Sequence, residues 1–82
     1  MVQNTEKYTV ITGASSGIGY ETAKAFAERG SSLILVARRK DILETLRQEI
    51  LALHPMLDII FKAADLAVPQ NVFQLYESIK SY

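Results

Sequence analysis

The sequence predicts an α/β fold, a parallel β-sheet in which three strands alternate with three helices. Three short apolar runs are separated by segments in which apolar residues recur at helical spacing, an alternation typical of parallel sheets with right-handed crossovers. The runs cover residues 8–11, 32–37 and 57–63. A glycine-rich stretch at residues 12–19 joins the first run to the first helix, and the remaining elements can be interpreted as its support.

The first strand is expected at residues 8–11, because this run is β-branched and aromatic. The following helix should end near Gly30, since glycine readily takes the left-handed conformation after a helix. Its spacing predicts a solvent-facing side made of Tyr20, Glu21, Lys24 and Glu28. The same spacing predicts an apolar side made of Ile18, Thr22, Ala25 and Phe26.

The second strand, at residues 32–37, is apolar almost throughout, as expected for a parallel strand covered on both faces. Asp41 is predicted to cap the next helix, with Glu44 completing a capping-box-like pair. This helix should end at His54, which precedes a proline and is interpreted as a terminal cap. Its predicted buried stripe consists of Ile42, Leu43, Leu46, Ile50 and Leu53.

The third strand candidate, at residues 57–63, carries a charge near each end. Asp58 and Lys62 suit a strand at the edge of a sheet. Pro69 is expected in the first turn of the last helix, where its missing N–H costs nothing. The predicted apolar face of that helix consists of Val72, Phe73, Tyr76 and Ile79.

The composition describes one small globular unit of 82 residues with a formal net charge of zero. Without surplus Lys and Arg there is no electrostatic basis for binding nucleic acid or an anionic membrane. The absence of cysteine excludes disulfides and thiolate metal sites and fits a reducing compartment. We find no secretory signal at residues 1–7 and no apolar run near the roughly 20 residues that span a bilayer. We therefore expect a cytoplasmic protein without a metal.

The glycine-rich stretch reads TGASSGIG over residues 12–19. A strand that turns directly into a helix needs backbone angles at Gly13 that a Cβ would obstruct. The missing side chains of Gly17 and Gly19 let a ligand approach the backbone and let the helix lie close to its strand. The first amides of the helix have no internal acceptor and carry the positive end of its dipole, so they suit a diphosphate. The stretch predicts a dinucleotide-binding turn.

Its glycine spacing is G-x-x-x-G-x-G, which differs from the general G-x-G-x-x-G fingerprint. It resembles the cofactor motif of the short-chain dehydrogenase/reductase family, nicotinamide-dependent oxidoreductases with a Rossmann fold. The resemblance implies that residues 1–82 form the N-terminal half of a dinucleotide-binding Rossmann domain. It also implies that the cofactor is bound by the turn residues Gly13, Ser15, Ser16, Gly17, Ile18 and Gly19.

The position that selects between NAD and NADP lies about 20 residues beyond the glycines, at the end of the second strand. No carboxylate is present there, since Ala37 is followed by Arg38 and Arg39. A guanidinium can bind a 2′-phosphate through paired hydrogen bonds, whereas a carboxylate would repel it. A basic residue here marks NADP users in the family, so NADP is predicted, with Arg38 as its ligand and Arg39 as backup. The alternative is a solvated basic turn.

Asp65 and Leu66, just after the third strand, resemble the family's adenine-contacting pair. The alternative for the aspartate is a cap or an Asx turn. The family's catalytic pair is Tyr-x-x-x-Lys, a spelling that Tyr76 and Lys80 match. We reject this match, because the pair belongs to a later helix and Ala63 stands thirteen residues before Tyr76 in place of the family's serine. Packing would explain the tyrosine, and no catalytic residue is predicted.

Two hypotheses follow. The first is the N-terminal cofactor-binding segment of an NADP(H)-dependent short-chain oxidoreductase that acts on a carbonyl or alcohol. The alternative is a non-catalytic nucleotide-binding or interaction module. In the Rossmann strand order the first strand needs a fourth strand on its other side. Without it, residues 8–11 would form an uncovered edge, so we expect a homo-oligomer through that edge.

Overall fold

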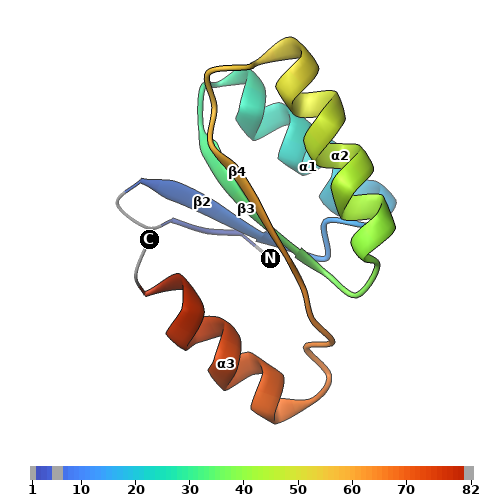
Figure 1. Ribbon diagram of the computed structural model, residues 1–82, viewed down its shortest axis with the longest axis vertical. Helices are drawn as coiled ribbons and strands as arrows, with labels where there is room; N and C mark the ends of the chain where they lie inside the picture. Colours follow the sequence, from blue (N-terminus) through green and yellow to red (C-terminus); the bar gives the residue numbers. More distant parts are fainter. Residues whose placement is uncertain (1, 5–6, 81–82) are drawn as a thin grey trace.

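The computed structural model describes residues 2–4 and 7–80 and shows a β-sheet with helices on both of its faces (Figure 1). The sheet has the order β1-β2-β3-β4. Its strands are β1 (Val2–Asn4), β2 (Tyr8–Thr12), β3 (Ser32–Ala37) and β4 (Ile59–Ala63). The helices are α1 (Gly17–Glu28), α2 (Lys40–Leu53) and α3 (Pro69–Ile79).

Three strands and three helices follow the predicted βαβαβα order. β2, β3 and β4 are parallel, with Val10 opposite Ile34 and Ile34 opposite Ile60. The predicted fold class is therefore confirmed. β4 lies at the edge of the sheet, as its charged residues predicted.

β3 is the centre of the core, because its two sets of alternating side chains are buried on opposite faces. Leu33 and Leu35 belong to the cluster that contains the inward side chains of α1 and α2. Ile34 and Val36 belong to a second cluster, which contains Leu75 and Ile79 of α3. The unbroken apolar run predicted a strand covered on both faces, and this prediction is confirmed.

The strand β1 was not predicted, and it corrects one expectation. β1 pairs antiparallel with β2, with Val2 opposite Ile11 and Asn4 opposite Thr9. The edge of β2 that we expected to be uncovered is therefore paired. The predicted homo-oligomer through that edge loses its physical basis, because the backbone groups of β2 already have a neighbouring strand.

The apolar side predicted for α1 is wrong in part. Its fully buried residues are Ala23 and Ala27, whereas the side chain of Ile18 is 85% exposed and Ala25 is exposed. Tyr20, expected to face solvent, packs against the core cluster. The two buried alanines let α1 lie close to the sheet, and Phe26, as predicted, packs against the same core cluster.

The end of α1 is as predicted. Gly30 has a φ of +85° and donates to the carbonyl of Ala27 at 2.9 Å. The amide of Ser31 donates to the carbonyl of Phe26 at 3.2 Å, which completes a Schellman motif.

α2 begins one residue earlier than the predicted cap. Arg39 is the N-cap residue, without a side-chain cap hydrogen bond, and Asp41 lies within the first turn. The capping role predicted for Asp41 is therefore wrong. The predicted buried stripe of α2 is confirmed at Leu43, Leu46 and Ile50, but Leu53 is 73% exposed.

α3 begins at Pro69, as predicted, but it is rotated relative to the predicted apolar face. Ile79 is buried as predicted, but the second buried residue is Leu75, which was not predicted, and Phe73 and Tyr76 are exposed. None of the helices over residues 2–4 and 7–80 has the length and apolarity that crossing a membrane requires.

Candidate nucleotide-binding site

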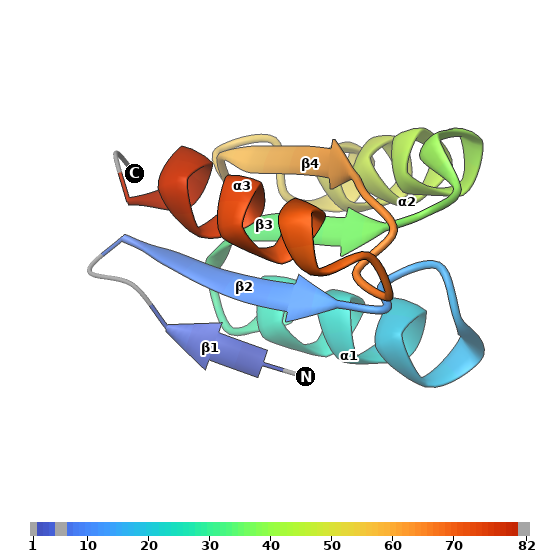
Figure 2. The ribbon, with the colours of Figure 1, turned by 90° about the horizontal axis from the view of Figure 1, so that it is seen from below.

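The carboxyl ends of the three parallel strands meet at one edge of the sheet, where the arrowheads of β2, β3 and β4 point the same way (Figure 2). The segments that follow them hold the glycine turn, Arg38 with Arg39, and Asp65 with Leu66. In open α/β sheets ligands bind at this edge.

The glycine turn is fixed by its own backbone and by β3. Gly13 has a φ of +70°, a conformation that side chains disfavour. Its carbonyl accepts from the amide of Ser16 at 3.1 Å, and the amide of Ala14 donates to the carbonyl of Val36, also at 3.1 Å. The start of α1 is therefore tied to the carboxyl end of β3.

The missing side chain has a different consequence at Gly19 than at Gly17. A Cβ on Gly19 would stand 2.1 Å from the carbonyl oxygen of Gly13, so this glycine lets α1 lie against the turn. A Cβ on Gly17 would meet no heavy atom within 4 Å. The backbone at Gly17 therefore faces open space, where a ligand can approach it.

Two amides at the start of α1 are open. The Ser16 side chain caps the helix, since its Oγ accepts from the amide of Gly19 at 3.3 Å. In the part of the chain described, the amides of Gly17 and Ile18 have no protein acceptor, and the first turn carries no acidic side chain. These donors, together with the positive end of the helix dipole, favour an anion.

A groove of about 500 Å³ runs beside this turn; we call it the Arg38 groove. It brings together residues from the three segments at the carboxyl edge. The predicted site residues among its lining are Gly13, Ser15, Ser16, Arg38, Asp65 and Leu66.

A second groove, of about 390 Å³, lies on the β1 side of the turn; we call it the Val2 groove. It shares Gly13, Ser16 and Leu66 with the Arg38 groove. Ile18 and Gly19 line it, together with Val2. Sequence reasoning missed Val2, because a three-residue strand carries no periodic signal.

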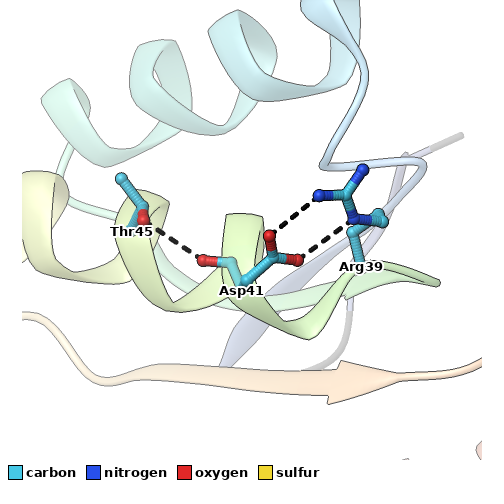
Figure 3. Close-up of polar contacts among 3 residues, drawn as sticks. All are labelled: Arg39, Asp41 and Thr45. Atoms are coloured by element: carbon cyan, nitrogen blue, oxygen red, sulfur yellow. Dashed lines mark hydrogen bonds and ion pairs between the residues drawn. The ribbon is translucent and has the colours of Figure 1, made fainter.

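Arg38 and Arg39 differ in their surroundings. Arg38 follows the last residue of β3 and lines the Arg38 groove. Arg39 instead donates to both carboxylate oxygens of Asp41, from Nε at 3.1 Å and from Nη2 at 2.9 Å (Figure 3). This hydrogen bonding holds the pKa of Asp41 below its usual value. Arg39 lines neither groove.

Asp65 and Leu66 both line the Arg38 groove. The carboxylate of Asp65 accepts from the amide of Ala67 at 3.0 Å, which is the Asx turn considered as the alternative. The carbonyl of Asp65 accepts from the side-chain amide of Asn71 at 2.9 Å. Asp65 can therefore form the Asx turn and line the Arg38 groove at the same time, because the turn only fixes its carboxylate in place.

The residues to which the sequence analysis assigned no catalytic or metal-binding role do not line this site. Tyr76 and Lys80 line neither groove, and Lys80 pairs with Glu77 at 3.3 Å. The expectation that packing explains Tyr76 is wrong, because its side chain is half exposed. His54 is the C-cap residue of α2, as predicted. No group of metal-ligating side chains occurs within residues 2–4 and 7–80.

A family model described as short chain dehydrogenase matches residues 7–82. The chain belongs to this family. It is 44% identical over 73 residues to an uncharacterised oxidoreductase of Staphylococcus saprophyticus, covering 89% of this chain and 28% of that protein. The chain thus spans little more than a quarter of this relative's length.

Two solved structures extend the comparison. The L-sorbose reductase of Gluconobacter frateurii, complexed with NADPH and L-sorbose, matches with a TM-score of 0.80 and 38% identity, over 88% of this chain and 27% of that one. A short-chain dehydrogenase from Sphingobium yanoikuyae in complex with NADPH matches with a TM-score of 0.74 and 40% identity, over 79% of this chain and 25% of that one. Members of the family that bind NADPH therefore share this fold.

Proposed function

We propose that the chain is the N-terminal cofactor-binding segment of an NADP(H)-dependent short-chain oxidoreductase acting on a carbonyl or alcohol substrate. In this proposal residues 1–82 are the N-terminal half of its dinucleotide-binding Rossmann domain, and the protein is cytoplasmic. The observation that carries the proposal is the Arg38 groove, which joins Arg38 and Asp65 to the glycine turn.

The residues present fit the diphosphate. The amides of Gly17 and Ile18 would donate to its oxygens, and Gly17 offers a backbone without a Cβ in open space. A carboxylate in the first turn of α1 would repel the phosphates, and that turn has none. Ser15, which lines the groove, adds a hydroxyl donor.

The fit also extends to the adenosine end. Arg38 would hold the 2′-phosphate, because it lines the groove directly after β3, where its sequence neighbours Ala37 and Arg39 bring no carboxylate. Arg39 would be the weaker contributor, since Asp41 already occupies its guanidinium. Asp65 would accept from the adenine amine, and the backbone of Leu66 would lie against the ring. The NADPH complexes among the structural neighbours support the choice of NADP.

When bound, the cofactor supplies hydride transfer to or from the substrate carbon. The residues of this chain bind and orient its adenosine and diphosphate parts. We propose no acid or base among residues 2–4 and 7–80, and we place substrate binding in the remainder of the oxidoreductase.

Calorimetric titration of the chain with 2′-phospho-ADP-ribose and with ADP-ribose tests the proposal. The two probes differ only in the 2′-phosphate. We expect the phosphorylated probe to bind about tenfold or more tightly, as charge-assisted hydrogen bonds predict. Equal affinities would overturn the choice of NADP, and absence of binding by both would overturn the nucleotide site. Saturable NADPH binding without hydride transfer by the protein that carries this segment would favour the non-catalytic module.

A further inference from the structure

β4 is an edge strand that the remainder of the proposed oxidoreductase would not cover. It is the outermost strand on the side of the sheet away from β1 (Figure 2). In the strand order 3-2-1-4-5-6 the third parallel strand stays at the edge of the complete sheet. Such an edge presents N–H and C=O groups on which another chain can add a strand. Protection against this pairing therefore has to come from residues of this chain.

The register of β4 identifies the backbone groups that face outward. The amide of Leu33 donates to the carbonyl of Asp58 at 3.0 Å, and the amide of Ala64 donates to the carbonyl of Ala37 at 2.8 Å. Bonding to the same neighbour recurs at every second residue of a strand. The odd-numbered residues of β4 therefore direct their amides and carbonyls away from β3. These residues are Ile59, Phe61 and Ala63.

Arg47 occupies one of these outward groups. Its Nε donates to the carbonyl oxygen of Ile59 at 2.8 Å, in a part-buried hydrogen bond. Arg47 lies on α2, and the side chain of Ile59 shares a core cluster with Leu46 and Ile50 of that helix. The guanidinium therefore reaches the edge of the sheet from a helix that the core holds in place.

The charge of Arg47 makes this contact an obstacle to a further strand. Within residues 2–4 and 7–80 Arg47 forms no ion pair. An added strand would have to displace the guanidinium from the Ile59 carbonyl or bury an unpaired charge, which is costly. Asp58 takes no part in this obstacle, because its carboxylate accepts from the hydroxyl of Tyr8 on β2, beyond β3 in the sheet.

We propose that Arg47 keeps the edge of β4 from pairing with a second copy of the chain. Two identical edges would pair antiparallel about a two-fold axis. With Phe61 at the centre, Ile59 of each copy would lie opposite Ala63 of the other. Arg47 occupies the Ile59 acceptor at both ends of this pairing and leaves only the centre open. The inference concerns assembly, beyond nucleotide binding, and needs no cofactor.

Sedimentation equilibrium of Arg47→Ala over a range of protein concentrations tests the proposal. The variant frees the Ile59 acceptor at both ends of the pairing, so we expect self-association about tenfold or more stronger than in the parent chain. Arg29→Ala is the matched control, because Arg29 is exposed at the end of α1, a helix that contacts β2 and β3 but not β4. It removes the same charge and should associate as the parent does.

Hydrogen exchange locates the contact. The amide of Phe61 faces outward, so pairing would protect it from exchange. In Arg47→Ala its exchange should slow as the protein concentration rises, whereas in the parent chain the rate should not depend on concentration.

A second substitution distinguishes pairing at the edge from association of partly unfolded chains. Ala63→Pro removes the outward N–H at the last residue of β4, a position at a sheet edge where proline is tolerated. Adding it to Arg47→Ala should return association to that of the parent chain, because the pairing loses a donor at both ends. Association of unfolded chains would persist.

Three results would overturn the role of Arg47. They are association of Arg47→Ala no stronger than that of the parent, an equal gain in Arg29→Ala, and association that Ala63→Pro does not reverse. None of them bears on the binding of 2′-phospho-ADP-ribose, so the proposed function would stand.

Discussion

α1 and α2 both begin just after a parallel strand, at the same edge of the sheet, but their N-termini differ. α2 carries Asp41 in its first turn, and Arg39 pairs with that carboxylate. α1 has no acidic residue in its first turn and leaves the amides of Gly17 and Ile18 open. A helix that supplies its own negative charge has less to offer a phosphate. The difference favours α1 as the helix that would receive the nucleotide of the proposed function.

The largest expected effect comes from closing the approach of α1 to its turn. Gly19→Ala would place a Cβ 2.1 Å from the carbonyl oxygen of Gly13, and the backbone would have to move. We expect urea unfolding to show a loss of about 3 kcal/mol and nucleotide binding to be lost. Gly17→Ala is the matched control, since its Cβ meets open space. The stability of Gly17→Ala should be unchanged or slightly higher. An equal loss of stability in the two variants would contradict the packing role assigned to Gly19.

The second effect distinguishes the two arginines. Arg38→Asp should reverse the preference for NADPH over NADH, because the new carboxylate repels the 2′-phosphate and accepts from ribose hydroxyls. We expect NADPH to lose about tenfold or more in affinity. Arg39→Ala should change the preference much less, since Arg39 pairs with Asp41 and lines neither groove. Titration of both variants with both cofactors shows which arginine sets the preference. If the preference changes in Arg39→Ala and not in Arg38→Asp, Arg38 is not the phosphate ligand.

The third effect concerns the cap of α1. Ser16→Ala removes the acceptor of the Gly19 amide, so we expect the free energy of unfolding to fall by about 1 kcal/mol. Ser15→Ala is the control, because Ser15 lines the groove and makes no side-chain hydrogen bond to any described residue. It should weaken nucleotide binding and leave stability unchanged. A larger stability loss at Ser15 would reverse the two assignments.

The smallest effect is the pH dependence of the α2 start. The hydrogen bond from Arg39 lowers the pKa of Asp41, so the folded state holds the carboxylate's proton less tightly than the unfolded state. The stabilisation is present above the unfolded pKa and is lost as pH falls through the lowered folded pKa. Thermal unfolding below about pH 4 should therefore show a slightly smaller acid loss in Asp41→Asn than in the parent. If acid lowers the unfolding temperature equally in Asp41→Asn and in the parent, the Arg39–Asp41 pair does not contribute to stability.

The order of elements follows from sequence, because it rests on local signals, and the candidate site stays a prediction that rests on signals of the same kind. The apolar run of β3 and the left-handed glycine after α1 are such signals. The inward sides of α1 and α3 follow only in part, because each helix has apolar residues on more of its surface than the sheet can cover, and packing selects among them. In α3 the sheet takes Leu75 and Ile79 and leaves Phe73 outside.

Two further features were missed because the sequence carries no pattern that distinguishes them. β1 has three residues, and its position depends on a strand with which it pairs only in the folded chain. Asp41 has the residue type of a cap, but its carboxylate pairs with Arg39, two residues before it. The sequence predicted Arg38 as the phosphate ligand and Arg39 as its backup. The structure gives a physical reason for this order, because Arg39 is paired with Asp41.

Backbone amide shifts in an NMR titration with 2′-phospho-ADP-ribose test the difference between the two helix starts most directly. The account predicts large saturable shifts for the amides of Gly17 and Ile18 and small ones for those of Asp41 and Ile42. Comparable shifts at both helices, or shifts at α2 alone, would contradict it.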